Sequence, residues 1–591
     1  MKKEGNYRPM KQTIKTLSKC VREFKFLALL TPCLVIGEVA MDVVVPMLIS
    51  NLIDYGITPG DMAYVVEVGL QLVVACVIAL AFGVASGYTA SKASSGFAKN
   101  LRQDMYYNVQ NFAFSNIDKF STPSIITRMT TDVTNVQMSF QMMTRIVVRA
   151  PIMLVSALFM SFKVGGRMAM VYVIVIPILA VALGLIVRSV TTIFRRAFKR
   201  YDHLNAVVEE NVSAIRVVKG FVREDYEIEK FEKISDAMRK DFTTAEARLG
   251  MNGPLMQGSI YTVMIAIFWF GSRYIVAGDM TTGNLMSLVT YTMQMLNSLN
   301  MISMIFTMMI MSRASMDRIA ELLAEVPDIR AEGKDLEQVP DGSIDFNHVS
   351  FSYTGNKEKE SLKDIDLHIK SGETIGIIGS TGSGKSTLVQ MIPRLYDTTE
   401  GEVLVGGINV RDYDLHALRN SVAMVLQKNV LFSGTIKSNL RWGDENATDE
   451  EMLHACQIAH ADEFIQGFPD KYDSHIEQGG TNVSGGQKQR LCIARALLKK
   501  PKILILDDST SAVDTKTDAM IREALATEQP ETTKIIVAQR ITSIQDCDRI
   551  IVLDEGRING IGTHEELLEN NEIYREVYTS QQKGVEEHAA D

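Results

Sequence analysis

Six long apolar stretches in the first half of the chain limit its possible folds most strongly. Each is long enough to cross about 30 Å of hydrocarbon as a helix that rises about 1.5 Å per residue. Their expected limits are Phe26 to Ile53, Ala63 to Tyr88, Gln137 to Phe162, Arg167 to Val187, Gly253 to Val276 and Thr282 to Met311. This half of the chain is therefore predicted to form a helical bundle in a membrane.

Two of the connections between these stretches are long, and the second is rich in Lys and Arg. Because positive charge concentrates in cytoplasmic links, both long links and both termini are predicted to be cytoplasmic. The long links keep a helical periodicity, so the membrane helices are expected to continue into the cytosol. The N-terminus is polar and basic over too long a stretch for a secretory signal, and Lys11 to Phe26 are expected to form an amphipathic helix on the membrane surface.

Two acidic residues, Glu38 and Asp42, lie four positions apart near the middle of the first stretch. They could line a polar cavity that accepts cationic compounds. Alternatively, they could cap a helix packing contact or pair with Arg145 or Arg149, which are expected in the first turns of the third stretch and could also reach the inner headgroups. The sequence leaves the cavity and the structural ion pair open.

The sixth stretch carries a series of methionines, among them Met286, Met293 and Met301. Methionine is flexible and polarisable, so this helix could line a promiscuous apolar binding surface. Packing within the membrane explains the same series almost as well.

After about Glu325 the sequence changes to that of a soluble α/β domain, whose centre reads GSTGSGKST. The complete pattern G-x-x-x-x-G-K-[ST] lies here, after an apolar strand and before a helix expected from near Thr387. Glycines let the backbone wrap an anion, N–H groups and the lysine attract phosphate, and the serine hydroxyl can ligate Mg²⁺. A nucleoside triphosphate is therefore expected at Gly379, Ser380, Thr381, Gly382, Ser383, Gly384, Lys385, Ser386 and Thr387.

Polar residues also follow other predicted strands of this half. Asp507 ends the apolar run KILIL, which is typical of a buried parallel strand, and could hold Mg²⁺ together with Ser386. Asp508 occupies the place of a base that polarises the attacking water. Gln539 follows another strand and could meet the γ-phosphate.

Three weaker features support the same chemistry. Tyr353, at the end of an alternating strand, could stack on a nucleotide base. Gln427 follows a further strand and could reach both the metal and the cytoplasmic ends of the membrane helices. The stretch NVSGGQKQR is a second Gly-rich turn that enters a helix and suits the phosphate of another molecule.

The net charge argues against a nucleic-acid-binding protein, and the cysteine spacing argues against a cysteine-ligated metal site. A formal net charge of −9 and a pI near 5.7 give no sign of a nucleic-acid partner. The six cysteines are scattered without metal-type spacing, which suits a reducing cytosol or a membrane interior.

Together these motifs resemble the ATP-binding cassette exporters, in the half-transporter form that fuses six membrane helices to one nucleotide-binding domain. The resemblance covers nearly the whole chain: the aromatic loop at Tyr353, the Walker A loop, the Q-loop at Gln427, the signature VSGGQ, the Walker B strand ILILDD, the D-loop SAVD and the switch position at Gln539. It implies a membrane α-helical bundle fused to an α/β P-loop nucleotide-binding domain. The implied segments are an elbow helix at 1–25, a transmembrane domain at 26–320, a linker at 321–341, a nucleotide-binding domain at 342–580 and a tail at 581–591.

In this family two nucleotide-binding domains meet head to tail, and each ATP lies between the Walker A loop of one and the signature of the other. The resemblance thus implies that Ser484, Gly485, Gly486 and Gln487 act on the partner's ATP, that Asp514 belongs to the D-loop, and that Mg²⁺ is held by Ser386, Gln427 and Asp507. Coupling helices, expected near Ser115 to Phe120 and Val212 to Val218, would dock on the nucleotide-binding domains.

Two positions depart from the family pattern within one ATP site. The usual catalytic glutamate is Asp508, and the usual switch histidine is Gln539. Aspartate is one methylene shorter, and misplacing a catalytic group by about an ångström can cost on the order of 10²-fold in rate. Glutamine cannot become cationic, so it stabilises the developing γ-phosphate charge less well. The site is predicted to hold ATP and to hydrolyse it slowly or not at all.

Paired changes at one site resemble the degenerate subunit of heterodimeric exporters. The prediction is a cell-membrane exporter of amphipathic compounds, paired with a non-identical subunit that carries the glutamate and the histidine. Lipid or peptide substrates, a slow homodimer and a non-transporting ATP-sensing regulator remain alternatives.

Overall fold

The computed structural model describes residues 9–330, 336–509 and 512–590. They form two compact units: Met1–Asn111 with Phe120–Glu325, and Phe112–Lys119 with Val326–Asp591. Residues 331–335 of the expected linker and Ser511 of the expected D-loop lie outside the described residues.

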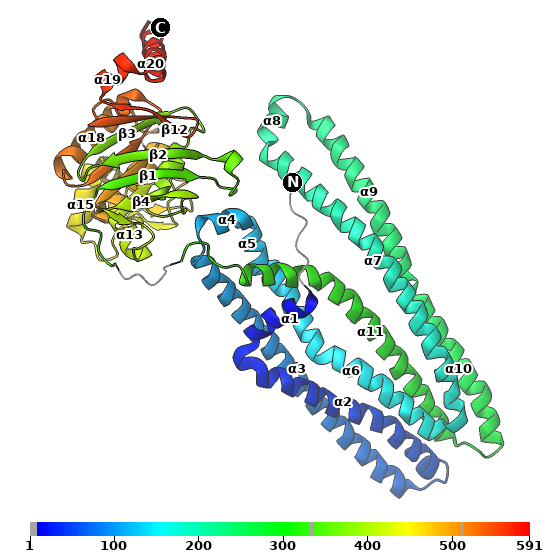
Figure 1. Cartoon of the computed structure of the whole chain (residues 1–591). Coiled ribbons are helices and arrows are strands. Elements are labelled where there is room, and N and C mark those ends of the chain that lie inside the picture. The colour runs from blue at the N-terminus through cyan, green and yellow to red at the C-terminus, as the bar shows by residue number, and fades with distance from the viewer. Residues whose placement is uncertain (1–8, 331–335, 510–511, 591) are drawn as a thin grey trace. The chain divides into compact units, whose positions relative to one another are not determined.

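The first unit is helical, with long helices that run past one another (Figure 1). Its elements are α1 (Met10–Ser18), η1 (Lys19–Phe24), α2 (Lys25–Asn51), η2 (Leu52–Ile57), α3 (Met62–Gln110), α5 (Thr122–Thr127), η3 (Arg128–Asp132), α6 (Val133–Gly165), η4 (Gly166–Ala169), α7 (Met170–Ser213), α8 (Ile215–Gly220), α9 (Glu224–Gly250), α10 (Asn252–Val276) and α11 (Thr282–Leu323). Helices α2, α3, α6, α7, α10 and α11 overlap the six expected apolar stretches.

Four continuous helical stretches among the described residues are long and apolar enough to cross a membrane. These are Met10–Ile57, Met62–Gln110, Thr122–Phe194 and Glu224–Val276. The third contains α6 and much of α7, because these helices follow each other with only η4 between them. Helix α11 lies outside the four stretches, and in its first part Ser, Thr, Asn and Gln interrupt the apolar residues.

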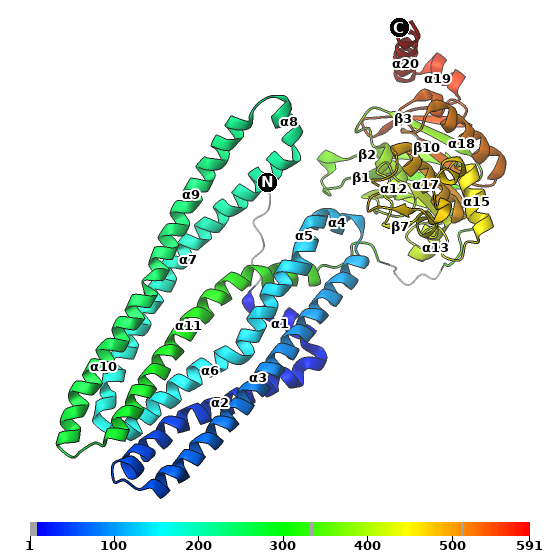
Figure 2. The ribbon, with the colours of Figure 1, turned by 180° about the vertical axis from the view of Figure 1, so that it is seen from behind.

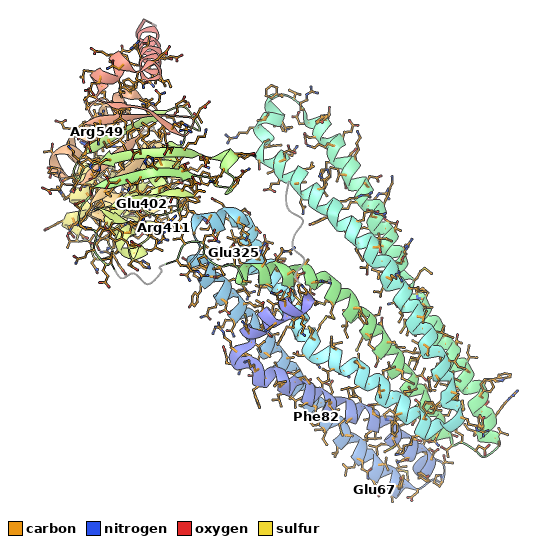
Figure 3. The ribbon with its side chains drawn as sticks, in the orientation of Figure 1. Glu67, Phe82, Glu325, Glu402, Arg411 and Arg549 are labelled. Carbon is orange, nitrogen blue, oxygen red and sulfur yellow. The ribbon has the colours of Figure 1, made fainter. Side chains whose placement is uncertain are left out.

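Several helices extend well beyond the length that a bilayer requires. Helices α7 and α9 run antiparallel and are joined by the short α8 at one end, as Figure 2 shows. The buried Asp241 of α9 ties the pair together, since Arg200 of α7 contacts its carboxylate at 2.8 Å. Close approach also joins α2 to α3, because a Cβ on Gly37 would lie 2.9 Å from the ring of Phe82, which is labelled in Figure 3.

The N-terminal helix is shorter than expected. Instead of one helix over Lys11 to Phe26, α1 ends at Ser18 and the chain bends inside η1, where Arg22 has φ 41°. The bend is held by α3: Arg22 Nη2 contacts Asp104 Oδ1 at 2.6 Å, and Asn100 Nδ2 donates to the Cys20 carbonyl oxygen at 3.0 Å.

The second unit is an α/β fold that includes the short helix α4 (Phe114–Phe120), most of which belongs to this unit. Its strands are β1 (Ile344–Phe351), β2 (Leu362–Ile369), β3 (Thr374–Gly379), β4 (Glu400–Val405), β5 (Ile408–Asn409), β6 (Val422–Val425), β7 (Gly434–Thr435), β8 (His475–Ile476), β9 (Ile503–Asp507), β10 (Thr533–Val537), β11 (Arg549–Asp554) and β12 (Arg557–Gly562). Its remaining helices are η5 (Lys357–Lys359), α12 (Lys385–Met391), α13 (Leu415–Ser421), α14 (Ile436–Leu440), α15 (Asp449–Ile458), α16 (Asp462–Gln466), η6 (Lys471–Asp473), α17 (Gly485–Leu498), α18 (Thr515–Glu528), η7 (Ile541–Ser543), α19 (His564–Asn570) and α20 (Glu572–Ala590).

The strands form an antiparallel sheet in the order β2-β1-β4-β5, a mainly parallel sheet in the order β12-β11-β3-β10-β9-β6, and a small β7-β8 pair. In the six-stranded sheet only β12 runs antiparallel to its neighbour. Strands β9 and β10 are buried along their whole length, as the unbroken apolar run Ile503 to Leu506 predicts for β9.

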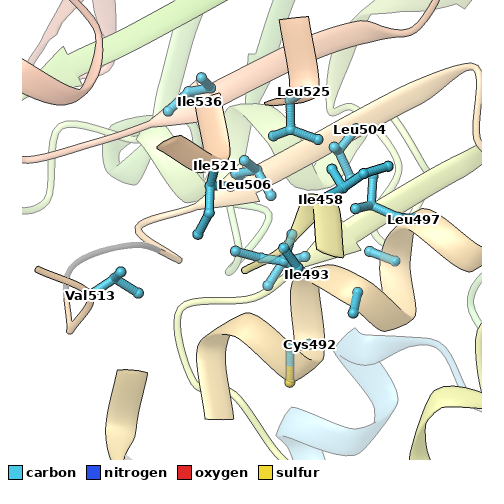
Figure 4. Close-up of a cluster of buried hydrophobic side chains, with 14 of the residues drawn as sticks. Ile458, Cys492, Ile493, Leu497, Leu504, Leu506, Val513, Ile521, Leu525 and Ile536 are labelled. Atoms are coloured by element: carbon cyan, nitrogen blue, oxygen red, sulfur yellow. The ribbon is translucent and has the colours of Figure 1, made fainter. Parts of the chain in front are cut away.

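A large apolar core supports one face of this sheet. It is lined by side chains of the strands and of α15, α17 and α18, including Ile458, Ile493, Leu504, Leu506, Ile521 and Ile536 (Figure 4). The carboxyl ends of β3, β10, β9 and β6 consequently lie side by side at one edge of a rigid sheet, which is where parallel sheets bind ligands.

Candidate functional site

The phosphate loop joins β3 to α12 at this edge, and its backbone requires glycine. Gly384 has φ 99°, and a Cβ there would lie 2.7 Å from the Ser361 carbonyl oxygen. The Oγ atom of Ser383 is buried and has no hydrogen-bond partner among the described residues. A loop of N–H groups with a buried, unpartnered hydroxyl fits a nucleotide phosphate.

Lys385 supplies the positive charge of the loop. Its Nζ donates to the carbonyl oxygens of Gly379 and Ser380, both at 2.8 Å. Partial burial lowers the pKa of Lys385, while Asp507 and Asp508 act in the opposite direction. A lysine held in this way is placed to exchange its carbonyl contacts for phosphate oxygens.

Two of the three expected metal ligands, Ser386 and Asp507, contact each other, and the third, Gln427, contacts the adjacent Asp508. Ser386 Oγ donates to Asp507 Oδ1 at 3.0 Å, across the gap between α12 and the end of β9. Burial raises the pKa of Asp507, and the hydrogen bond from Ser386 opposes this shift. A hydroxyl, a carboxylate and the nearby amide of Gln427 are oxygen donors of the kind that Mg²⁺ takes while it keeps several waters. The donor set therefore fits Mg²⁺.

Asp508 is contacted by two glutamine amides. Gln427 Nε2 donates to its Oδ2 at 3.1 Å, and Gln539 Nε2 donates to the same oxygen at 2.8 Å. These residues follow β6, β9 and β10, so three neighbouring strands of the sheet deliver them to one point. The structure thus brings both positions that depart from the family pattern into direct contact.

Tyr353 lies just beyond β1 with about half of its surface exposed, 51%. Its hydroxyl is 3.0 Å from Thr387 Oγ1 in α12, which places the ring beside the phosphate loop. Partial burial raises the pKa of Tyr353. A ring that is fixed at its hydroxyl and exposed on its surface can accept a stacked base.

Tyr396 is a residue of this region that the sequence did not single out. Its ring packs edge-on against Tyr353, with 5.2 Å between the centroids, and its hydroxyl donates to Asp118 Oδ2 of α4 at 2.8 Å. Asn116 fixes α4 further, since its side chain accepts from the Asp328 N–H at 3.0 Å. No local pattern marks Tyr396, because its partner lies far away in the sequence. The expected coupling segment at Ser115 to Phe120 is part of α4, and the segment expected at Val212 to Val218 spans the end of α7 and most of α8.

The signature residues form the start of α17. Ser484 caps the helix by accepting from the Gln487 N–H at 3.3 Å, and the Gln487 side chain accepts from the Ser484 N–H at 2.9 Å. Gly485 and Gly486 form the first turn, so the N–H groups of the helix start remain close to the surface. Asp514 caps α18 through the Thr517 N–H at 2.9 Å, a bond that lowers the pKa of Asp514.

A groove of about 320 Å³ lies beside Gln427 in the second unit. Its lining includes the exposed Trp442, whose ring stacks on Phe432 at 4.2 Å, together with Leu426 and Val430. Arg495 and Lys499 add positive charge to its wall.

In the first unit, Glu38 and Asp42 of α2 both contact Arg149 of α6. Arg149 Nη1 pairs with Glu38, and its Nη2 lies 2.8 Å from Asp42 Oδ2. Arg145 is more distant, at 3.9 Å from Glu38. The arginines do not lie in the first turns of this helix as expected, because α6 already begins at Val133 and carries them to its middle.

The methionines of α11 face different ways. Met286, Met293 and Met301 are partly exposed, whereas Met295 is fully buried. Gln294, next to Met293, donates to the Asp42 carbonyl oxygen at 2.9 Å and so joins α11 to the acidic pair.

Comparison with known proteins places both halves of the chain. Residues 28–299 match the family description "ABC transporter transmembrane region", and residues 362–511 match "ABC transporter". The uncharacterized ABC transporter ATP-binding protein YfiB of Bacillus subtilis is 35% identical over 95% of this chain and 97% of its own length. The ATP-dependent lipid A-core flippase of Chromobacterium violaceum is 30% identical over 91% of this chain and 92% of its own length.

Among solved structures, a bacterial Atm1-family ABC exporter with ATP bound superposes with a TM-score of 0.79. It covers 96% of this chain and 98% of its own, at 22% identity, so the likeness concerns the fold. Sequence and fold therefore agree that this chain belongs to the ABC transporter family and has the fold of an ABC exporter, with the helical membrane region and the ATP-binding domain in one polypeptide.

Proposed function

We propose that this chain is one subunit of a heterodimeric, ATP-driven exporter, and that its own ATP site holds ATP but hydrolyses it slowly or not at all. The observation that carries the proposal is the contact of Gln427 and Gln539 with one carboxylate oxygen of Asp508. This oxygen already accepts two amide hydrogens, so a water must displace one of them or use the other carboxylate oxygen before Asp508 can take its proton.

The binding parts of the site support retention of ATP. Lys385, Ser386 and the loop glycines would hold the phosphates and Mg²⁺, and Tyr353 would take the base. Bound Mg²⁺ would neutralise charge on the phosphates. The shorter Asp508 and the uncharged Gln539 weaken only the groups that act on the attacking water and on the γ-phosphate.

The partner subunit would provide the active site. It would carry a glutamate and a histidine where this chain has Asp508 and Gln539, and the helix start at Ser484 to Gln487 would complete its ATP site. ATP binding then closes the two domains, and hydrolysis at the partner's site reopens them. The degenerate site would stay occupied and bias the pair towards closure.

Motion would reach the membrane through the short cytoplasmic helices. The Tyr396 to Asp118 bond would fix α4 to the ATP-binding domain. The exposed Val217 of α8 and Phe221, which follows α8, would pack into the partner's groove that corresponds to the one beside Gln427, since both surfaces present exposed apolar side chains. We place the ATP-binding domain and both termini in the cytoplasm.

The transported compound would be amphipathic. A lipid flippase among the relatives and the partly exposed Met286, Met293 and Met301 of α11 support this class. Glu38 and Asp42 would act mainly as an ion pair with Arg149, which leaves the apolar surface to define the cargo site.

Purification tests the heterodimer. The chain is tagged and expressed together with the neighbouring transporter reading frame, and the purified complex is analysed by mass spectrometry. The proposal expects two non-identical subunits in equal amounts. A stable dimer of this chain alone that transports and hydrolyses ATP at ordinary rates would support the homodimer instead. ATP-dependent substrate movement in vesicles that hold both chains would exclude a purely regulatory protein.

A further inference from the structure

The C-terminal helix α20 contacts the segment that carries Gln539. Gln581 Nε2 donates to the Gln539 carbonyl oxygen at 2.8 Å, and Gln581 Oε1 accepts from the Ile541 N–H at 2.9 Å. One side-chain amide thus pairs with a carbonyl and an N–H two residues apart, as a neighbouring strand would. Both polar atoms of the amide are used, and its orientation is fixed because only this one satisfies the carbonyl and the N–H together.

The position of Gln581 is itself well defined. Tyr574, two helical turns earlier on the same face, is fully buried, and its hydroxyl is 2.7 Å from His564 Nδ1. Ile541 is also buried in the core that contains Tyr574. Helix α20 is therefore anchored to the domain at its start, and Gln581 follows on the anchored face. The next residue, Gln582, is exposed and donates to Tyr578 Oη at 2.8 Å within the helix.

The segment held by Gln581 leads directly into the ATP site. It follows β10, and its first residue, Gln539, contacts Asp508 at 2.8 Å. A shift of the Gln539 backbone would move its amide relative to Asp508 and to the γ-phosphate position. Displacing a positioned group by about 1 Å at such a site has a large effect on the reaction rate.

We propose that Gln581 is a positioning residue that fixes the placement of Gln539, so that the C-terminal helix sets how the ATP site distinguishes ATP from ADP. The proposal rests on the proposed function in one respect, that Gln539 meets the γ-phosphate. It does not depend on whether the site hydrolyses ATP or on the identity of the partner.

The test compares the purified full-length wild type with Gln581→Ala, Gln581→Glu and the matched control Gln582→Ala. The control removes a glutamine amide and one hydrogen bond from the same helix. It leaves the contacts of Gln581 with Gln539 and Ile541 in place. Affinities for ADP and for the non-hydrolysable analogue AMP-PNP are measured by displacement of a fluorescent nucleotide, and amide hydrogen exchange is followed over residues 538–545. Any site from a partner chain is identical in all four preparations.

Gln581→Ala is expected to speed amide exchange over residues 538–545. It is also expected to weaken AMP-PNP binding about 3- to 10-fold, which corresponds to the loss of one ordinary hydrogen bond between Gln539 and the γ-phosphate. ADP has no γ-phosphate, so its binding should not change. Gln581→Glu keeps an acceptor for the Ile541 N–H but loses the donor to Gln539. It is expected to show the affinity change with little change in exchange at Ile541, which also provides a result if the alanine variant does not purify. Gln582→Ala is expected to match the wild type.

Three results would overturn the proposal. Unchanged exchange in Gln581→Ala would show that the contact does not hold the segment. Faster exchange with an unchanged ratio of AMP-PNP to ADP affinity would limit Gln581 to a stabilising role. An equal effect of Gln582→Ala would assign the change to the helix in general.

Discussion

Gln539 Nε2 donates a hydrogen bond to Oδ2 of Asp508 over 2.8 Å, so the two residues that depart from the family pattern in this ATP site contact each other. An amide donor holds its hydrogen and stays neutral, whereas a histidine could take a proton and a positive charge. The two positions therefore act on each other: Asp508 is the shorter acid, and Gln539 holds one of its oxygens in a hydrogen bond. Under the proposed function, this pair would let the site keep its binding groups while it hydrolyses ATP slowly.

Ser383→Ala is expected to weaken ATP binding without lowering the stability of the folded protein. The Ser383 hydroxyl is buried without a partner among the described residues, so its removal costs the folded protein no hydrogen bond. ATP affinity should fall roughly 3- to 10-fold if the hydroxyl meets phosphate. Nucleotide titration and thermal unfolding of both proteins measure the two effects. Ser474→Ala removes a second buried, unpartnered hydroxyl far from the loop in sequence and should change neither quantity. A loss of stability in Ser383→Ala without weaker binding would contradict the assignment.

Tyr396→Phe and Asp118→Ala are expected to uncouple ATPase activity from substrate. Each change removes the same hydrogen bond, 2.8 Å long, so the double variant should be no worse than either single one. The measured quantity is the stimulation of ATPase activity by transported substrate, while nucleotide affinity should stay within about twofold, because the bond does not touch the phosphate loop. Tyr472→Phe is the matched control, since its hydroxyl donates to Asp462 at 2.9 Å away from α4. Additive losses in the double variant would show that the two residues act separately.

Arg149→Met is expected to destabilise the membrane region strongly, because it leaves Glu38 buried and unpaired by its main partner. Breaking a buried pair typically costs about 3–5 kcal/mol, and a lower value is expected here since Arg149 is only partly buried. Adding Glu38→Gln should restore part of the loss. The melting temperature in detergent measures these changes, with Arg145→Met, 3.9 Å from Glu38, as the milder control. If Glu38→Gln alone leaves the melting temperature unchanged but alters the transported compounds, the acidic pair belongs to a cargo cavity.

His348 predicts a small pH-dependent contribution to stability. The hydrogen bond with Asp364, 2.8 Å long, raises the pKa of His348 in the folded protein. A raised histidine pKa stabilises the fold fully below the unfolded pKa of about 6.5, and this contribution disappears as pH rises through the folded pKa. The difference in melting temperature between wild type and His348→Asn should therefore be largest near pH 6 and vanish by about pH 9. A difference that is constant over this range would show that the ion pair does not contribute.

The sequence predicted the parts of this protein that depend on local patterns. The strand, loop and helix around Lys385 follow from glycine spacing and apolar runs, and α2, α3, α6, α7, α10 and α11 follow from hydropathy. Contacts between distant segments that no motif or charge pattern marks were beyond it. Nothing near Tyr396 points to Asp118, and nothing in the last helix points from Gln581 to Gln539. The same limit explains the bend at Arg22, which contacts with α3 impose on a locally helical stretch.

ATPase activity tests the roles of Asp508 and Gln539 most directly. The complex is purified through a tag on this chain, and wild type is compared with Asp508→Glu/Gln539→His, each with and without a glutamine in place of the partner's catalytic glutamate. We expect the partner change to abolish turnover in wild type. We expect the restored site to regain turnover, by up to about 10²-fold over its unrestored form. If this chain instead purifies alone as a dimer that hydrolyses ATP at ordinary rates, or if the restored site gains nothing, the degenerate-site account is wrong.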